Sequence, residues 1–78
     1  MTRIITFAEA IREALDQAMT EDQNVIVFGL GVDDPKAIFG TTAGLQESYG
    51  EGRVFDTPTS ENAMTGVGVG AALNGLRP

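Results

Sequence analysis

The sequence contains no cysteine and no histidine. The absence of cysteine rules out a disulfide that could support a small core, and it fits a reducing compartment. The absence of histidine excludes imidazole chemistry within this chain. No serine or threonine has an evident base partner in the sequence, so a nucleophilic triad is unsupported.

Basic residues are also few and scattered, and the net charge is −6. This pattern argues against nucleic acid or an anionic membrane as the main partner. The longest weakly polar run, residues 63–73, is too short to span a bilayer, and the N-terminus lacks the apolar run of a secretory signal. We therefore expect a soluble, cytoplasmic protein. The basic residues are Arg3, Arg12, Lys36, Arg53 and Arg77.

The first half of the chain predicts a helix followed by a buried strand. Thr6 and Glu9 form a T-x-x-E capping box, and apolar residues then recur at helical spacing, which predicts a helix over 7–19. The continuous apolar run 25–28 predicts a strand covered on both faces. "KAIFG", in the following loop, is compatible with a single helical turn.

The second half repeats this order. "TTAGLQESYG" predicts a short helix capped by Thr41 or Thr42 and closed by Gly50, and residues 53–55 predict a second strand. Ser60 is expected to cap a last helix over 61–74, which Gly75 closes. Alternation of helices and strands indicates a layered α/β fold with a parallel sheet. Two strands in 78 residues indicate the opening part of a larger domain.

The last predicted helix contains glycine at three interior positions, 66, 68 and 70. Each glycine costs roughly 0.8 to 1 kcal/mol relative to alanine, so another interaction has to offset the loss. Gly66 and Gly70 lie one turn apart and leave a groove that a helix or backbone could approach closely. We expect this helix to be buried in an interface, within a larger domain or between subunits.

Other motifs in the chain are weak. "GVGVGA" (66–71) satisfies G-x-G-x-x-A, but it does not come directly from a strand as a dinucleotide fingerprint should. Gly29 and Gly31 do follow a strand, but the next position of that pattern is Asp34, beside Asp33, and carboxylates repel phosphate. These aspartates lack further spaced ligands, so no metal site is predicted. Spacing alone leaves Glu61 as a favourable charge at a helix N-terminus.

The segment "DTPTSENAMTGVGVGAALNGLRP" (56–78) resembles the beta subunit of thiamine-diphosphate-dependent 2-oxo-acid dehydrogenases of the pyruvate and branched-chain type. The shared part is the transketolase-like pyrimidine-binding domain, which carries D-T-P-x-S-E before a glycine-alanine helix ending in G-x-R-P. "ITFAEAIREALDQAM", "DQNVIVFG" and "TAGLQESYGEGRVFDTP" are similar to the preceding parts of that domain. Residues 1–78 then form the N-terminal, truncated part of a three-layer parallel-sheet domain.

The resemblance implies that Glu61 is both the catalytic residue and the cofactor-binding residue. Its carboxyl group would meet the aminopyrimidine ring of thiamine diphosphate and favour the imino tautomer, which activates the cofactor for oxidative decarboxylation of a 2-oxo acid. An alpha subunit would hold the diphosphate and Mg²⁺. A second beta subunit and a lipoyl acyltransferase are the other implied partners. The 78 residues are not expected to be active alone.

Two alternatives stay open: a non-catalytic α/β association module, and another relative in the transketolase superfamily. The sequence also departs from the family at one place. Many beta subunits have an acidic residue after the glycine that ends the first strand, where this chain has Leu30 and Gly31. Asp33 or Asp34 could supply the missing acid from a shifted position.

Overall fold

The computed structural model describes residues 3–34 and 40–78. Helix α1 spans Phe7–Glu21 and begins with the predicted capping box: the Glu9 amide donates to Thr6 Oγ1 at 3.1 Å, and the Thr6 amide donates to Glu9 Oε2 at 3.4 Å. The expected helix over 7–19 is therefore confirmed and is two residues longer. The suggested helical turn at "KAIFG" lies, apart from Gly40, outside the described residues.

The two strands are parallel, as expected. Strand β1 spans Val27–Gly29 and strand β2 spans Val54–Asp56, with Val27 opposite Val54 and Gly29 opposite Asp56. Both strands begin later than the hydrophobic runs predicted. In the first run, Val25 instead forms an isolated parallel bridge with Arg77, near the end of the chain.

The two outer edges of this sheet differ. On the β2 side, the Val54 amide donates to the Gly50 carbonyl at 3.0 Å, and Gln46 Nε2 donates to the Val54 carbonyl at 3.0 Å. On the β1 side, the Ile26 amide donates to the Arg77 carbonyl at 3.0 Å. The β2 edge is thus closed by neighbouring residues, whereas among the described residues the β1 edge is joined only by residues close to Pro78.

Helix α2, Leu45–Tyr49, is shorter than the sequence predicted, and its expected start is wrong. Neither Thr41 nor Thr42 caps it. Gly44 occupies the N-cap position in a left-handed conformation (φ 76°), and no side chain caps the helix. This conformation favours glycine and separates the turns over 41–44 from the helix. Gly50 closes the helix as expected, since its amide donates to the Gln46 carbonyl at 2.7 Å.

Helix α3, Glu61–Leu73, follows the predicted bounds closely. Gly75 closes the helix in a left-handed conformation with φ 97°. The Gly75 amide donates to the Ala72 carbonyl and the Leu76 amide donates to the Ala71 carbonyl, which are the two hydrogen bonds of a Schellman motif. Ser60 is the N-cap residue, but its side chain makes no capping hydrogen bond. None of the helices in the described part of the chain is long and apolar enough to cross a membrane.

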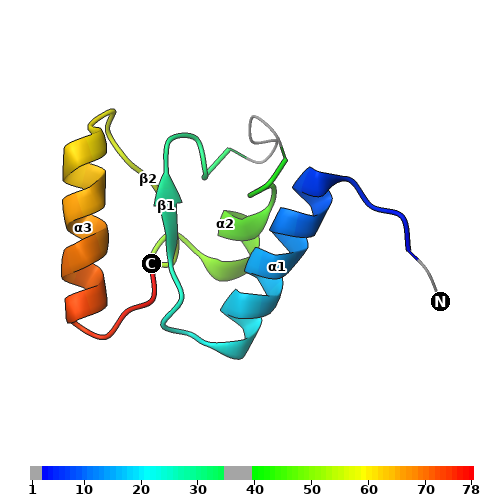
Figure 1. The fold of residues 1–78 in the computed structure, drawn as a ribbon, viewed down its shortest axis with the longest axis horizontal. Helices are drawn as coiled ribbons and strands as arrows, with labels where there is room; N and C mark the ends of the chain where they lie inside the picture. The colour runs from blue at the N-terminus through cyan, green and yellow to red at the C-terminus, as the bar shows by residue number, and fades with distance from the viewer. Residues whose placement is uncertain (1–2, 35–39) are drawn as a thin grey trace.

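The elements form three layers, with α3 on one side of the strands and α1 and α2 on the other (Figure 1). The core lies on the α1–α2 side, where Met19, Leu45 and Val54 are at most 1% exposed. On the α3 side, the rings of Phe28 and Phe55 stack with centroids 5.6 Å apart. The predicted parallel α/β architecture, with a strand covered on both faces, is confirmed.

Arg53 connects α1 to the sheet through backbone carbonyls. Its guanidinium donates to Met19 at 2.8 Å, to Asp22 at 2.9 Å and to Val25 at 3.1 and 3.2 Å. The same group lies over the Tyr49 ring, 5.1 Å from its centroid. One side chain thereby satisfies carbonyls at the C-terminal end of α1 and before β1, and it stacks on α2.

Candidate functional site

Glu61 is the first residue of α3, and this helix begins at the end of the sheet where the parallel strands terminate (Figure 1). The side chain is exposed and has no hydrogen bond or ion pair within residues 3–34 and 40–78. In open parallel sheets, ligands bind at this carboxyl edge. The carboxylate is therefore held on a helix and available to a ligand.

The segment between β2 and α3 contributes a second polar atom. Thr57 Oγ1 is buried and has no hydrogen-bond partner in the described structure. Buried hydroxyl groups are normally satisfied by protein, water or ligand. This unsatisfied oxygen lies on the same short connection that leads to Glu61, so the connection has unused capacity for hydrogen bonding.

The glycine positions of α3 divide between two environments. Gly68 faces the sheet, where a Cβ would lie 3.5 Å from Phe28 Cζ. Gly66 and Gly70 have no neighbouring atom within 4 Å of the place where a Cβ would lie, among the residues that the structure describes. Val67, Val69 and Leu73 are also at least half exposed. The bare flank inferred from spacing is present on α3, and its burial in an interface stays a prediction.

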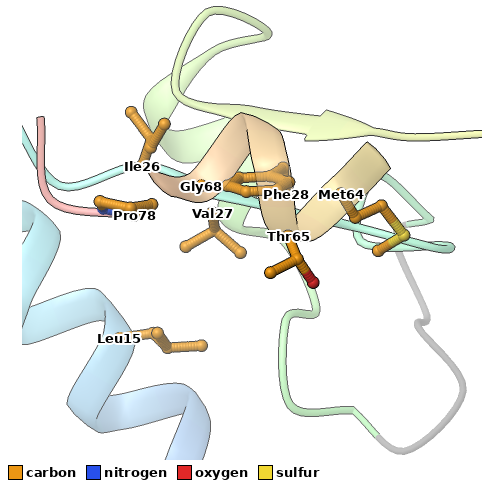
Figure 2. A pocket seen from close by; sticks show the side chains of 8 residues that line it. All are labelled: Leu15, Ile26, Val27, Phe28, Met64, Thr65, Gly68 and Pro78. Carbon is orange, nitrogen blue, oxygen red and sulfur yellow. The ribbon is translucent and has the colours of Figure 1, made fainter. Parts of the chain in front are cut away.

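An apolar groove of about 440 Å³ lies along the outer edge of β1, between α1 and α3. Figure 2 shows the side chains that line it, and Glu61 is not one of them. The groove and the candidate carboxylate are therefore separate features. The lining residues are Leu15, Ile26, Val27, Phe28, Met64, Thr65, Gly68 and Pro78.

The turn after β1 contains Leu30 and Gly31, the two residues at which the sequence departs from the acidic pattern of many beta subunits. Leu30 is 49% exposed, and Gly31 adopts a left-handed conformation with φ 74°. Asp33 and Asp34 are exposed. Within the described ranges, no group of three acidic side chains is arranged to hold a metal ion.

Sequence reasoning missed the contact of Asp56 with this turn. The Gly31 amide donates to Asp56 Oδ1 at 2.8 Å. The two residues are far apart in the sequence, and only the parallel register, which places Gly29 opposite Asp56, brings them together. A prediction of strand register from the apolar runs would have been the one available signal.

The described residues thus form a parallel α/β layer with an exposed acidic residue at the start of α3, on the carboxyl edge of the sheet. Residues 3–78 match the model of the transketolase pyrimidine-binding domain family. The chain belongs to this family. The resemblance noted on the D-T-P-x-S-E segment is thereby confirmed.

Within this family, the chain is similar in sequence to beta subunits of 2-oxo-acid dehydrogenases. The chain is 53% identical over 75 residues to the pyruvate dehydrogenase E1 component subunit beta of Acholeplasma laidlawii, covering 96% of this chain and 23% of that protein. It is 44% identical over 75 residues to the 2-oxoisovalerate dehydrogenase subunit beta of Bacillus subtilis, with the same coverage of 96% and 23%. The chain thus spans about a quarter of the length of these relatives.

Proposed function

We propose that residues 1–78 are the N-terminal part of the pyrimidine-binding domain of a 2-oxo-acid dehydrogenase beta subunit, and that Glu61 binds the aminopyrimidine ring of thiamine diphosphate. The position of Glu61 carries this proposal: an exposed, unpaired carboxylate at the start of α3 and at the carboxyl edge of a parallel sheet. The family match over residues 3–78 supports it.

Glu61 fits such a ring because its carboxyl group has no competing partner in the described chain. A carboxyl group can share a proton with a ring nitrogen, and burial of the pair by a cofactor strengthens that hydrogen bond. The α3 backbone fixes the direction of approach. When bound, thiamine diphosphate supplies the nucleophilic carbon and the electron sink that decarboxylation of a 2-oxo acid requires.

The remaining contacts of the cofactor are assigned to other chains. We propose that an alpha subunit holds the diphosphate and Mg²⁺, and that a second beta subunit and a lipoyl acyltransferase complete the assembly. The bare flank of α3, at Gly66 and Gly70, is the surface of this chain that best suits close approach by another subunit. The proposed location is the cytoplasm.

The test uses a hybrid beta subunit, in which these 78 residues replace the matching segment of the Acholeplasma laidlawii subunit. The hybrid is mixed with the alpha subunit of that organism, and CO₂ release from pyruvate and from 2-oxoisovalerate is measured with and without thiamine diphosphate. We expect release that depends on the cofactor. A hybrid that assembles fully but releases no CO₂ would instead favour a non-catalytic association module.

Alanine substitution of glycine on α3 should separate helix stability from assembly. Gly66→Ala is expected to stabilise the 78-residue chain by roughly 0.8 to 1 kcal/mol, because alanine favours the helix and no described atom obstructs a Cβ there. In the hybrid, the same Cβ occupies the bare flank and should weaken association with the other subunits by about tenfold, a cost of ~1.4 kcal/mol. Urea unfolding and analytical ultracentrifugation measure the two effects.

Gly68→Ala is the matched control, since its Cβ would meet Phe28 at an ordinary contact distance of 3.5 Å inside the chain. Gly68→Ala should also stabilise the helix, and it should leave association with the other subunits unchanged. If Gly66→Ala and Gly68→Ala have equal effects on association, the bare flank is not an interface.

A further inference from the structure

Asp56 joins three parts of the chain that meet at the carboxyl edge of the sheet. It is the last residue of β2, and its carboxylate accepts the Gly31 amide of the turn after β1 at 2.8 Å. It also precedes the connection that leads to Glu61. Hydrogen bonds between a carboxylate and a backbone amide are among the stronger ones, so this contact can hold the turn to the end of β2.

The end of β1, next to this turn, lies near the Met64 side chain of α3. A Cβ built at Gly29 would lie 3.4 Å from Val32 Cγ1 and 4.0 Å from Met64 Cε. Met64 is in the first turn of α3, and its amide donates to the Ser60 carbonyl at 2.9 Å. The Met64 side chain therefore ends beside Gly29, the residue at which β1 leads into this turn.

The connection itself provides little else to fix Glu61. Besides the Ser60 carbonyl that accepts the Met64 amide, its backbone contributes a bond from the Ser60 amide to the Pro58 carbonyl, at 2.9 Å. The Ser60 side chain does not cap α3, and Thr57 Oγ1 is unsatisfied in the described structure. The nearest side-chain anchor before Glu61 is thus the Asp56 carboxylate.

We propose that Asp56 is a positioning residue for Glu61: by holding the Gly31 amide it fixes the end of β1, beside which the Met64 side chain lies, and so fixes the first turn of α3. The inference rests on the proposed function only for its catalytic consequence. The contact of Asp56 with Gly31 and its effect on the start of α3 are properties of this chain alone.

Amide hydrogen exchange in the ¹⁵N-labelled 78-residue chain tests the structural part. Asp56→Ala should speed exchange at the Gly31 and Met64 amides by about tenfold, the effect of losing one hydrogen bond. Asp56→Asn keeps an acceptor oxygen and should restore exchange to within about threefold of wild type. Unchanged exchange at Met64 in Asp56→Ala would overturn the proposal.

Asp22→Ala is the matched control. Asp22 Oδ1 accepts the Asn24 amide at 2.8 Å, a contact of the same kind before β1 begins. This substitution should change exchange near Asn24 and leave Met64 unaffected. If Asp56→Ala and Asp22→Ala speed exchange at Met64 equally, the effect is general loss of stability and the proposal fails.

The hybrid beta subunit tests the catalytic consequence. Asp56→Ala should lower kcat by about tenfold, with a smaller change in the KM for the 2-oxo acid, and Asp56→Asn should recover most of kcat. Faster exchange at Met64 with unchanged kcat would overturn the positioning role. A wild-type hybrid without thiamine-dependent activity would instead refute the proposed function, while the exchange result would still decide the contact.

Discussion

Glu61→Gln is expected to lower CO₂ release by the hybrid enzyme by about 10² to 10⁴-fold, the usual contribution of a positioned acid–base group. Glutamine preserves the size of the side chain and its ability to form a hydrogen bond, but it cannot share an ionisable proton with a ring nitrogen. The loss should fall on kcat, since the assembly surface of α3 is unchanged. Steady-state kinetics at saturating thiamine diphosphate measure it.

Glu47→Gln provides a control of equal charge change. Glu47 is an exposed carboxylate in the first turn of α2, so it shares with Glu61 a favourable position at a helix start. The Glu47→Gln substitution should leave kcat within about twofold of the wild-type value, because surface substitutions of this kind have small effects. Normal turnover by Glu61→Gln would reject the role assigned to Glu61.

Arg53→Ala is expected to destabilise the chain by about 3 kcal/mol, a large part of the stability of a small domain. The substitution removes a charged donor from the carbonyls of Met19, Asp22 and Val25, and it removes the cation above the Tyr49 ring. Arg53→Lys should recover only part of this loss, because an ammonium group lacks the planar fork that reaches several acceptors. Urea unfolding followed by circular dichroism measures both variants.

Arg3→Ala is the comparison for charge alone. Arg3 pairs with Glu13 at 2.7 Å, but the two side chains are 64% and 36% exposed. Surface pairs of this kind contribute about 0 to 1 kcal/mol. Equal unfolding midpoints for Arg53→Ala and Arg3→Ala would contradict the assigned role of Arg53.

The local features of the fold could be predicted from sequence because they depend on neighbouring residues. The capping box at Thr6 and Glu9 and the closing glycine at position 75 both act within one helical turn. The alternation of helices with apolar strands was enough to predict a parallel sheet, since parallel strands need crossover connections. Glu61 was found by its motif and helix position, and its role awaits the kinetic test.

The features that sequence reasoning missed depend on long-range packing. The start of α2 is set by the left-handed Gly44, and the threonines before it offered an equally plausible cap. Phe7 and Leu15 both belong to the apolar residues that recur at helical spacing in α1, yet Phe7 is 87% exposed while Leu15 packs on the core. Helix α2 and the sheet cover the half of this face that contains Leu15, and their position cannot be read from the spacing within α1.

The unequal edges of the sheet limit how copies of this chain can associate through their backbones. Gln46 and Gly50 already occupy the outward-facing groups of Val54, so β2 offers a poor template for a further strand. A further strand, from a second molecule or from another part of the protein, would therefore pair on the β1 side, where within the described residues Val25 forms a single parallel bridge with Arg77.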